Sequence, residues 1–175
     1  ALVLGSGMSS LGVELLSNGF ANRMTQVDIS RFAIIHMQQV YRTVLKQQQE
    51  LISTLTEEKK KSLTLLDFKH VDVREMSDDF EDNTFDVVID KACFDNILTS
   101  ETGEIDIPDV ETEVWRVLKP NGGQWLMVSV LPLEGIESLL IQCPWKVECV
   151  GNVSFAGGRA AANFYRLIKT SDNEE

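Results

Sequence analysis

Two glycines that flank a serine, followed later by an aspartate, are the first residues in the chain that could do chemistry. Gly5, Ser6 and Gly7 follow an apolar run over residues 1–4. A glycine turn directly after a strand lets a ligand approach the backbone, because glycine has no Cβ and tolerates positive φ. Asp28 ends a second extended run, and a carboxylate there can accept hydrogen bonds from both hydroxyls of a ribose. This order predicts a nucleotide-binding α/β unit.

The glycine spacing does not by itself identify the ligand. The dinucleotide fingerprint G-x-G-x-x-G/A needs a third small residue, and Ser10 stands at that position. Serine is small, so this position decides little between a dinucleotide and another adenosine ligand. The stretch Asp28, Ile29 and Ser30 is also compatible with an ordinary helix start.

A second group of charged residues stands in the middle of the chain. Asp90, Lys91 and Asp95 form a D-K-x-x-x-D pattern at the end of an apolar run. Ligands of open α/β sheets bind beyond the carboxyl ends of the strands, so Asp90 is expected at the binding edge. Alternatively, Lys91 and Asp95 form a helical i, i+4 ion pair worth roughly 0.3 kcal/mol. Phe94 is expected in the core or the pocket wall rather than as a cation-binding face.

Alternating extended and helical patterns must position these residues. One predicted strand is the extended run that ends at Asp28. The others are predicted over residues 1–4, 65–71, 85–90, 124–130, 146–150 and 163–169. Helical periodicity follows the glycine turn and is also predicted over 30–55 (as one kinked helix or two), around 94–98, from Pro108 to 118 and over 132–143. Residues 100–107 are predicted to be a loop, and the glycine at 151 opens another. The alternation predicts a parallel, doubly wound sheet, and the two successive strands at the end predict one antiparallel strand.

The composition is typical of one soluble globular domain that covers residues 1–175. The formal net charge of −11 disfavours a nucleic-acid partner, which needs clustered lysines and arginines, and favours a basic one. Three cysteines without C-x-x-C spacing indicate a reducing, cytoplasmic setting, and no metal site is expected. No stretch approaches the length of a membrane span, so no membrane partner is expected. The chain opens inside a strand without Met, so we expect an N-terminal segment to be missing.

Five motifs in this order resemble those of class I S-adenosylmethionine-dependent methyltransferases. ALVLGSG resembles the first motif, VDIS the ribose-binding acid, and VDV at 71–73 the strand end beside the adenine. FDVVIDKACFDNIL resembles the fourth motif, and VWRVLKPNGGQWLMVS the segment that follows it. The resemblance implies a Rossmann-like, seven-stranded, mostly parallel sheet with one antiparallel strand near the C-terminus. It covers nearly the whole chain apart from residues 46–62, which we expect to be an inserted helical segment.

The resemblance also implies where S-adenosylmethionine, and its product S-adenosylhomocysteine, would bind. The glycine turn would contact the methionine part by its backbone, Asp28 the ribose, and Asp72 the amino group of the adenine. The full expected set of cofactor-binding residues is Gly5, Ser6, Gly7, Asp28, Ile29, Ser30, Asp72, Val73, Asp90 and Lys91. Methyl transfer to an amine also requires loss of a proton, which Asp90, Asp95 or water could accept.

The D-K-x-x-x-D pattern resembles the subgroup that methylates lysines, or an α-amine, of proteins such as elongation factor 1A or citrate synthase. That subgroup often reads D-K-G-T-x-D, whereas this chain has Ala92 and Cys93 at the two central positions. The resemblance therefore implies methyl transfer to an amine, with a lysine of a basic protein as the expected acceptor. Alternatives are a small-molecule methyltransferase, a non-catalytic binding subunit with the same fold and, at greater distance, an NAD-dependent oxidoreductase.

Overall fold

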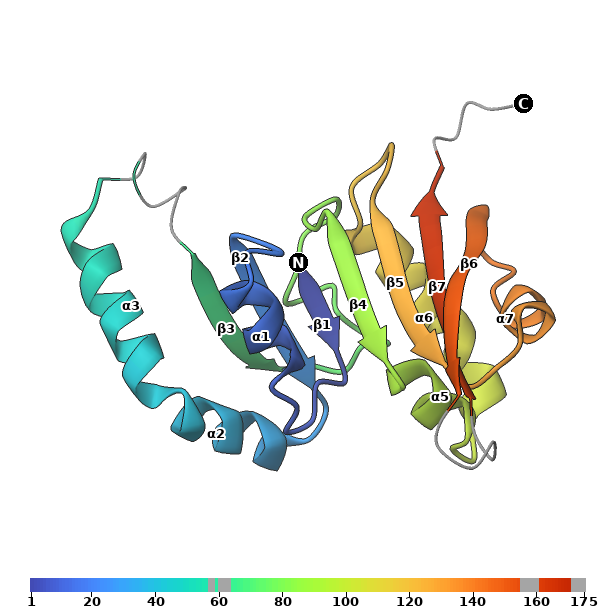
Figure 1. Cartoon of the computed structure of the whole chain (residues 1–175), viewed down its shortest axis with the longest axis horizontal. Helices are drawn as coiled ribbons and strands as arrows, with labels where there is room; N and C mark the ends of the chain where they lie inside the picture. The colour runs from blue at the N-terminus through green and yellow to red at the C-terminus, as the bar shows by residue number, and fades with distance from the viewer. Residues whose placement is uncertain (57–58, 60–63, 155–160, 171–175) are drawn as a thin grey trace.

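The computed structural model describes residues 1–56, 59, 64–154 and 161–170, which form a seven-stranded sheet with helices on both faces (Figure 1). The strands are β1 (Leu2–Leu4), β2 (Arg23–Asp28), β3 (Leu65–His70), β4 (Val87–Lys91), β5 (Gln124–Ser129), β6 (Trp145–Ser154) and β7 (Ala161–Lys169). The helices are α1 (Leu11–Ser17), α2 (Arg31–Val40), α3 (Arg42–Thr54), α5 (Cys93–Leu98), α6 (Gly103–Val117) and α7 (Leu133–Leu139). In the described part of the chain, no helix is both long enough and apolar enough to cross a membrane.

The sheet has the strand order β3-β2-β1-β4-β5-β7-β6. The first five strands pair in parallel, and β7 runs antiparallel to both of its neighbours, β5 and β6. This arrangement confirms the predicted doubly wound, mostly parallel sheet. The strand order reverses between β1 and β4, so the loops that follow these two strands lead to opposite faces. A crevice is expected at that point.

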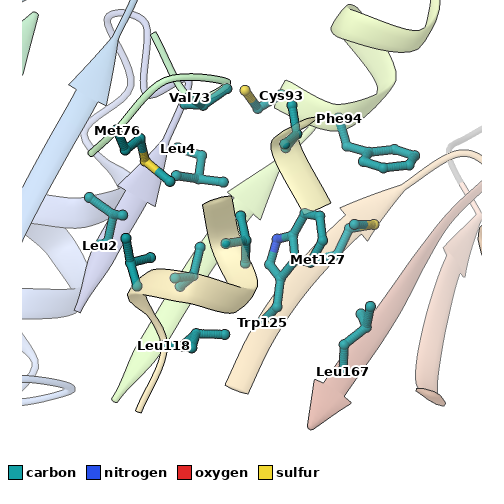
Figure 2. Packing of buried hydrophobic residues seen from close by; sticks show 14 of the residues in the cluster. Leu2, Leu4, Val73, Met76, Cys93, Phe94, Leu118, Trp125, Met127 and Leu167 are labelled. Atoms are coloured by element: carbon teal, nitrogen blue, oxygen red, sulfur yellow. The ribbon is translucent and has the colours of Figure 1, made fainter. Parts of the chain in front are cut away.

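Alternate residues of the central strands pack into two separate core layers. Leu2 and Leu4 of β1 belong to the layer that also includes α6, whereas Val3 belongs to the layer beneath α1 and α2. Figure 2 shows the first layer, in which Trp125 is fully buried and meets the edge of Phe94 with 6.0 Å between ring centroids. Strands that are apolar on both sides are what a parallel sheet covered on two faces requires.

Helix α6 begins earlier than the sequence pattern predicts. The pattern gives a loop up to Ile107 and a helix start at Pro108, but α6 starts at Gly103 and contains the proline. An interior proline removes one backbone hydrogen bond and destabilises a helix. Two contacts before it offset this cost, since Ile107 is buried in the core and Asp106 forms an ion pair with Arg74. The additional turns bring α6 to the cavity described below.

The helical stretch over 30–55 is two helices, α2 and α3, which are separated at Tyr41. The ring of Tyr41 stacks on Phe68 of β3, with 5.8 Å between the ring centroids. This contact holds the junction against the sheet while α3 continues along the edge strand. Part of the predicted insertion at 46–62 is therefore α3, and its positions 57–58 and 60–62 lie outside the described residues.

Two boundaries near the C-terminus also differ from the prediction. Strand β6 does not stop before Gly151 but continues to Ser154, and an irregular register leaves Val150 unpaired between Cys149 and Gly151. The helix predicted over 132–143 is shorter, because α7 ends at Leu139. Local periodicity overestimates such a helix because it does not include where the chain must turn into the next strand.

Candidate functional site

A cavity of about 430 Å³ opens at the carboxyl edge of the sheet, where the loops after β1 and β4 separate. Segments that follow four strands line it, among them Gly5 after β1, Asp28 at the end of β2, residues 71–74 after β3 and Cys93 after β4. Residues of α5 and of the start of α6 complete the wall. This is the position at which open α/β sheets bind their ligands.

The carboxylate of Asp28 lies in the cavity wall with both of its oxygens anchored. Gly7 donates its backbone N–H to Oδ2 at 2.7 Å, and Ser30 donates its own to Oδ1 at 2.7 Å. Each oxygen of an ionised carboxylate has a further lone pair, so Asp28 can still accept two hydrogen bonds from a diol. Ile29 is 61% exposed and lines the cavity beside it. Ser30 also begins α2, where its hydroxyl accepts from the N–H of Ala33.

Two glycines shape the loop between β1 and α1 in different ways. Both have positive φ, +50° at Gly5 and +52° at Gly7. A Cβ on Gly5 would lie 2.5 Å from Sγ of Cys93, so this glycine is required by packing. A Cβ on Gly7 would meet nothing within 4 Å, which leaves the backbone open to a ligand. Ser6 is buried, and its Oγ has no hydrogen-bond partner within the described residues.

Close packing of helix on strand occurs at Gly12 rather than at Ser10, the third position of the fingerprint. A Cβ on Gly12 would lie 2.6 Å from the amide carbon of Gln26, a fully buried residue of β2. Ser10 is the N-cap of α1, and its hydroxyl bonds to the carboxylate of Glu14. The sequence signal for this contact is a glycine inside an otherwise helical pattern.

Asp72 and Val73 both line the cavity, on the wall formed by the segment after β3. The carboxylate of Asp72 accepts hydrogen bonds from Arg74, at 2.6 Å from Nη2 and 3.0 Å from Nε. This guanidinium holds the pKa of Asp72 below its usual range. Arg74 also reaches Asp106 of α6, with 2.9 Å between Nη1 and Oδ2. Sequence reasoning missed this pair, because no local pattern links residues that are 32 positions apart.

Asp90 has no exposed surface and does not belong to the cavity wall. Its carboxylate accepts the backbone N–H groups of Cys93 at 2.8 Å and Phe94 at 3.1 Å, so it caps the start of α5. Burial raises its pKa to about 7, against the partial offset of these two hydrogen bonds. The cofactor contact and the proton transfer predicted for Asp90 stay predictions.

Asp95 and Lys91 point to different parts of the structure. The carboxylate of Asp95 bonds to the hydroxyl of Ser129 at 2.5 Å and to the backbone N–H of Val130 at 3.2 Å, so it faces the end of β5. Lys91 is exposed and borders a small hollow beside Ser6. The i, i+4 ion pair considered for Lys91 and Asp95 is absent from the described residues. The catalytic role of Asp95 stays a prediction.

The backbone conformation of Ala92, between Lys91 and α5, indicates why the related pattern D-K-G-T-x-D has a glycine at this position. Ala92 has φ +64° and ψ +12°, in the left-handed region that favours glycine. The backbone therefore keeps the conformation that glycine would adopt at lower cost. At the next position, burial raises the pKa of the Cys93 thiol well above its ordinary value, so this residue packs in the cavity wall as a neutral thiol.

Together the sheet and the cavity define a class of protein, a Rossmann-like nucleotide-binding domain with a carboxylate placed for a ribose. A sequence profile of the family described as methyltransferase domain matches residues 2–126. The chain therefore belongs to the methyltransferase domain family, and its motifs make it a class I S-adenosylmethionine-dependent methyltransferase by family.

The comparisons with individual proteins agree with this assignment. The chain is 32% identical to EEF1A lysine methyltransferase 4 of Mus musculus over 139 residues, which are 75% of this chain and 46% of that protein. The chain thus spans about half the length of the curated relative it matches. Its fold is similar to YcgJ from Bacillus subtilis, with a TM-score of 0.68, 10% identity and coverage of 97% and 91% of the two chains. It is also similar to the N-methyltransferase NodS from Bradyrhizobium japonicum WM9, solved with S-adenosyl-L-homocysteine, with a TM-score of 0.63, 13% identity and coverage of 96% and 76%.

S-adenosylmethionine is the cofactor of this family, and the residues of the cavity fit it. The open side of Gly7 allows the close backbone approach that the methionine part needs. Asp28 offers two free acceptor positions to a ribose, and Ile29 and Val73 provide apolar surface for a flat base. All four residues were expected from the sequence. Asp28, Ile29 and Val73 line one cavity, and Gly7 donates its backbone N–H to the carboxylate of Asp28.

Proposed function

We propose that this domain transfers the methyl group of S-adenosylmethionine to an amine, and that the acceptor is a lysine of a basic protein. The observation that supports binding of the methyl donor is the position of Asp28, a carboxylate anchored by two backbone N–H groups on the wall of the cavity. The acceptor half rests on the 32% identity to a curated lysine methyltransferase and on the net charge of −11.

When bound, S-adenosylmethionine supplies a methyl group already activated by its positively charged sulfur. The chain then has to hold the donor and the amine in line and to exclude water, since no further activation is needed. Gly7, Asp28 and the apolar side chain of Ile29 would hold the donor. The attacking nitrogen forms its bond to carbon as the carbon–sulfur bond breaks, and the amine loses one proton.

Two carboxylates are candidates for that proton, and their surroundings differ. Neither residue is part of the cavity lining. Asp90 is fully buried as the cap of α5, whereas Asp95 within α5 is partly exposed and faces the end of β5. A general base must reach the proton that it removes, directly or through one water. We therefore propose that Asp95 accepts the proton of the amine and that Asp90 supports the site by capping α5.

The donor assignment is tested with Asp28→Ala and S-adenosylhomocysteine in titration calorimetry. Loss of two hydrogen bonds to a charged acceptor is expected to weaken binding by about tenfold or more. Asp109→Ala on the exposed face of α6 is the matched control and should bind like wild type. Undiminished binding by Asp28→Ala would remove the ribose assignment.

The acceptor assignment is tested by incubating the domain with labelled donor and a cell extract. Labelled methyl groups are expected on protein, and mass spectrometry should place one methyl group on a lysine side chain. Label found only in the small-molecule fraction would support the alternative acceptor class instead.

A further inference from the structure

One wall of the cavity is held together by a single guanidinium group. Arg74 bonds to Asp72 through Nε and Nη2, and to Asp106 through Nη1. All three residues line the cavity, and the hydroxyl of Thr102 also bonds to Asp106, at 2.7 Å. Arg74 thus joins the segment after β3 to the first turns of α6 across the end of the cavity.

The charges around the cavity depend on this residue. Among the described residues of the lining, Asp28, Asp72 and Asp106 are acidic and Arg74 is the basic one. Its planar fork can pair with two carboxylates at fixed angles, which a lysine ammonium cannot do. With both carboxylates bonded to the guanidinium, Asp72 is held in one orientation and Asp106 has a positively charged partner. The carboxylate of Asp28 instead accepts hydrogen bonds from two backbone N–H groups.

We propose that Arg74 is a positioning residue for the adenine end of the donor site. It fixes the carboxylate of Asp72 toward the cavity and ties it to α6, so that Asp72 can distinguish an amino group from a carbonyl on the bound base. The inference rests on the proposed function, because it requires an adenosine donor in this cavity. It goes further by naming the residue that sets the selectivity for the base.

The test compares two ligands in titration calorimetry, S-adenosylhomocysteine and its inosine analogue, in which a carbonyl replaces the amino group. Wild type is expected to prefer the adenine compound by about tenfold or more, since a mismatched polar group is left facing a carboxylate. Arg74→Met should weaken binding of the adenine compound and reduce the preference to about twofold. The loss is expected in KM for the donor more than in kcat, because Arg74 does not contact the reacting atoms.

Two further variants keep the test decisive if Arg74→Met does not fold. Arg74→Lys retains the charge but not the fork, so its preference should fall between those of wild type and Arg74→Met. Asp106→Asn removes the anchor on α6 and should lower the preference in the same direction. Arg116→Met is the matched control, because Arg116 is equally engaged, with Glu113 and Asp82, but lies away from the cavity.

The outcomes separate this inference from the proposed function. If wild type binds neither compound, the proposed function fails and this inference with it. If wild type binds and prefers the adenine compound, but the preference is unchanged in Arg74→Met and Arg74→Lys, only the role of Arg74 is overturned. An equal loss of preference in Arg116→Met would also overturn it, since the effect would then be a general loss of stability.

Discussion

Two aspartates on the parallel strands that flank β1 have different surroundings in this domain. Asp28 ends β2 at the wall of an open cavity, whereas Asp90 lies within β4 and is fully buried next to the start of α5. Both accept two backbone N–H groups, so hydrogen bonding alone does not separate them. Burial does, because removal of water disfavours the charged form and raises the pKa of Asp90 to about 7.

This shift predicts a pH dependence of stability. The pKa of Asp90 rises from its ordinary value of 3.8 to about 7 on folding, so the folded protein keeps a proton that the unfolded chain loses. The free energy of unfolding should therefore fall as the pH rises from about 4 to 7, by roughly 4 kcal/mol at most. Asp90→Asn retains an acceptor for the cap of α5 and lacks this titration. Its stability relative to wild type should increase over the same range.

Chemical denaturation of both proteins at several pH values between 4 and 8 measures this difference. Arginine partners lower the pKa of other carboxyls, such as Asp72 and Glu113. These groups make the free energy of unfolding rise with pH at lower pH, equally in both proteins. The difference between the two proteins cancels those contributions. A difference that is constant with pH would contradict the assigned protonation of Asp90.

At the same scale, the residues that the sequence could predict are those with a local signal. Asp28 follows a strand and precedes a helix, so its position on the cavity wall could be predicted from a short motif. Arg74 and Asp106 gain their role only by meeting each other, and the second of them stands in a stretch that reads as loop. The burial of Asp90 beneath α5 likewise depends on tertiary packing, which a motif match does not contain.

At the scale of elements, the free edge of β3 is covered by side chains from the helices beside it. The amide of Gln48 on α3 donates to the backbone O of Leu66 and accepts its N–H, both at 2.9 Å. Gln38 on α2 donates to the backbone O of Phe68. These glutamines complete hydrogen bonds that an edge strand otherwise leaves to water or to another chain. The hydrophobic periodicity of the sequence predicts the two helices. It does not predict that polar side chains on them bond to the backbone of β3.

Loss of this contact should expose the edge of the sheet. Gln48→Ala is expected to lower the free energy of unfolding by about 1 kcal/mol, because two hydrogen bonds to the backbone of β3 are lost. Hydrogen exchange monitored by NMR should show faster exchange at the amide of Leu66. Gln47→Ala, at the exposed neighbouring position, is the control and should leave that amide protected. Equal exchange rates in the two variants would show that α3 does not guard this edge.

At the scale of the molecule, the alternation of strands and helices could be predicted because every buried strand needs an apolar run. The prediction failed where tertiary contacts override local preference, as in the early start of α6 ahead of Pro108. The resulting sheet gathers acidic side chains of β2, of the β3–β4 segment and of α6 at one edge, where the cavity opens. Together with the net charge of −11, this edge is the electrostatic basis for the proposed basic acceptor.

That charge predicts different salt dependences for the two substrates. Association of a basic acceptor protein is steered by charges that salt screens, so kcat/KM for methyl transfer should fall about tenfold between roughly 50 mM and 500 mM salt. The proposed donor site is a partly enclosed cavity, where salt screens charges less, so the Kd of the donor should change by less than about twofold. Initial rates with labelled donor measure the first effect, and calorimetry measures the second. An acceptor peptide whose flanking basic residues are replaced by glutamine is the control and should lose both its rate advantage and its salt sensitivity. Transfer to a basic acceptor that is independent of salt would contradict electrostatic recruitment and favour an acceptor recognised by shape alone.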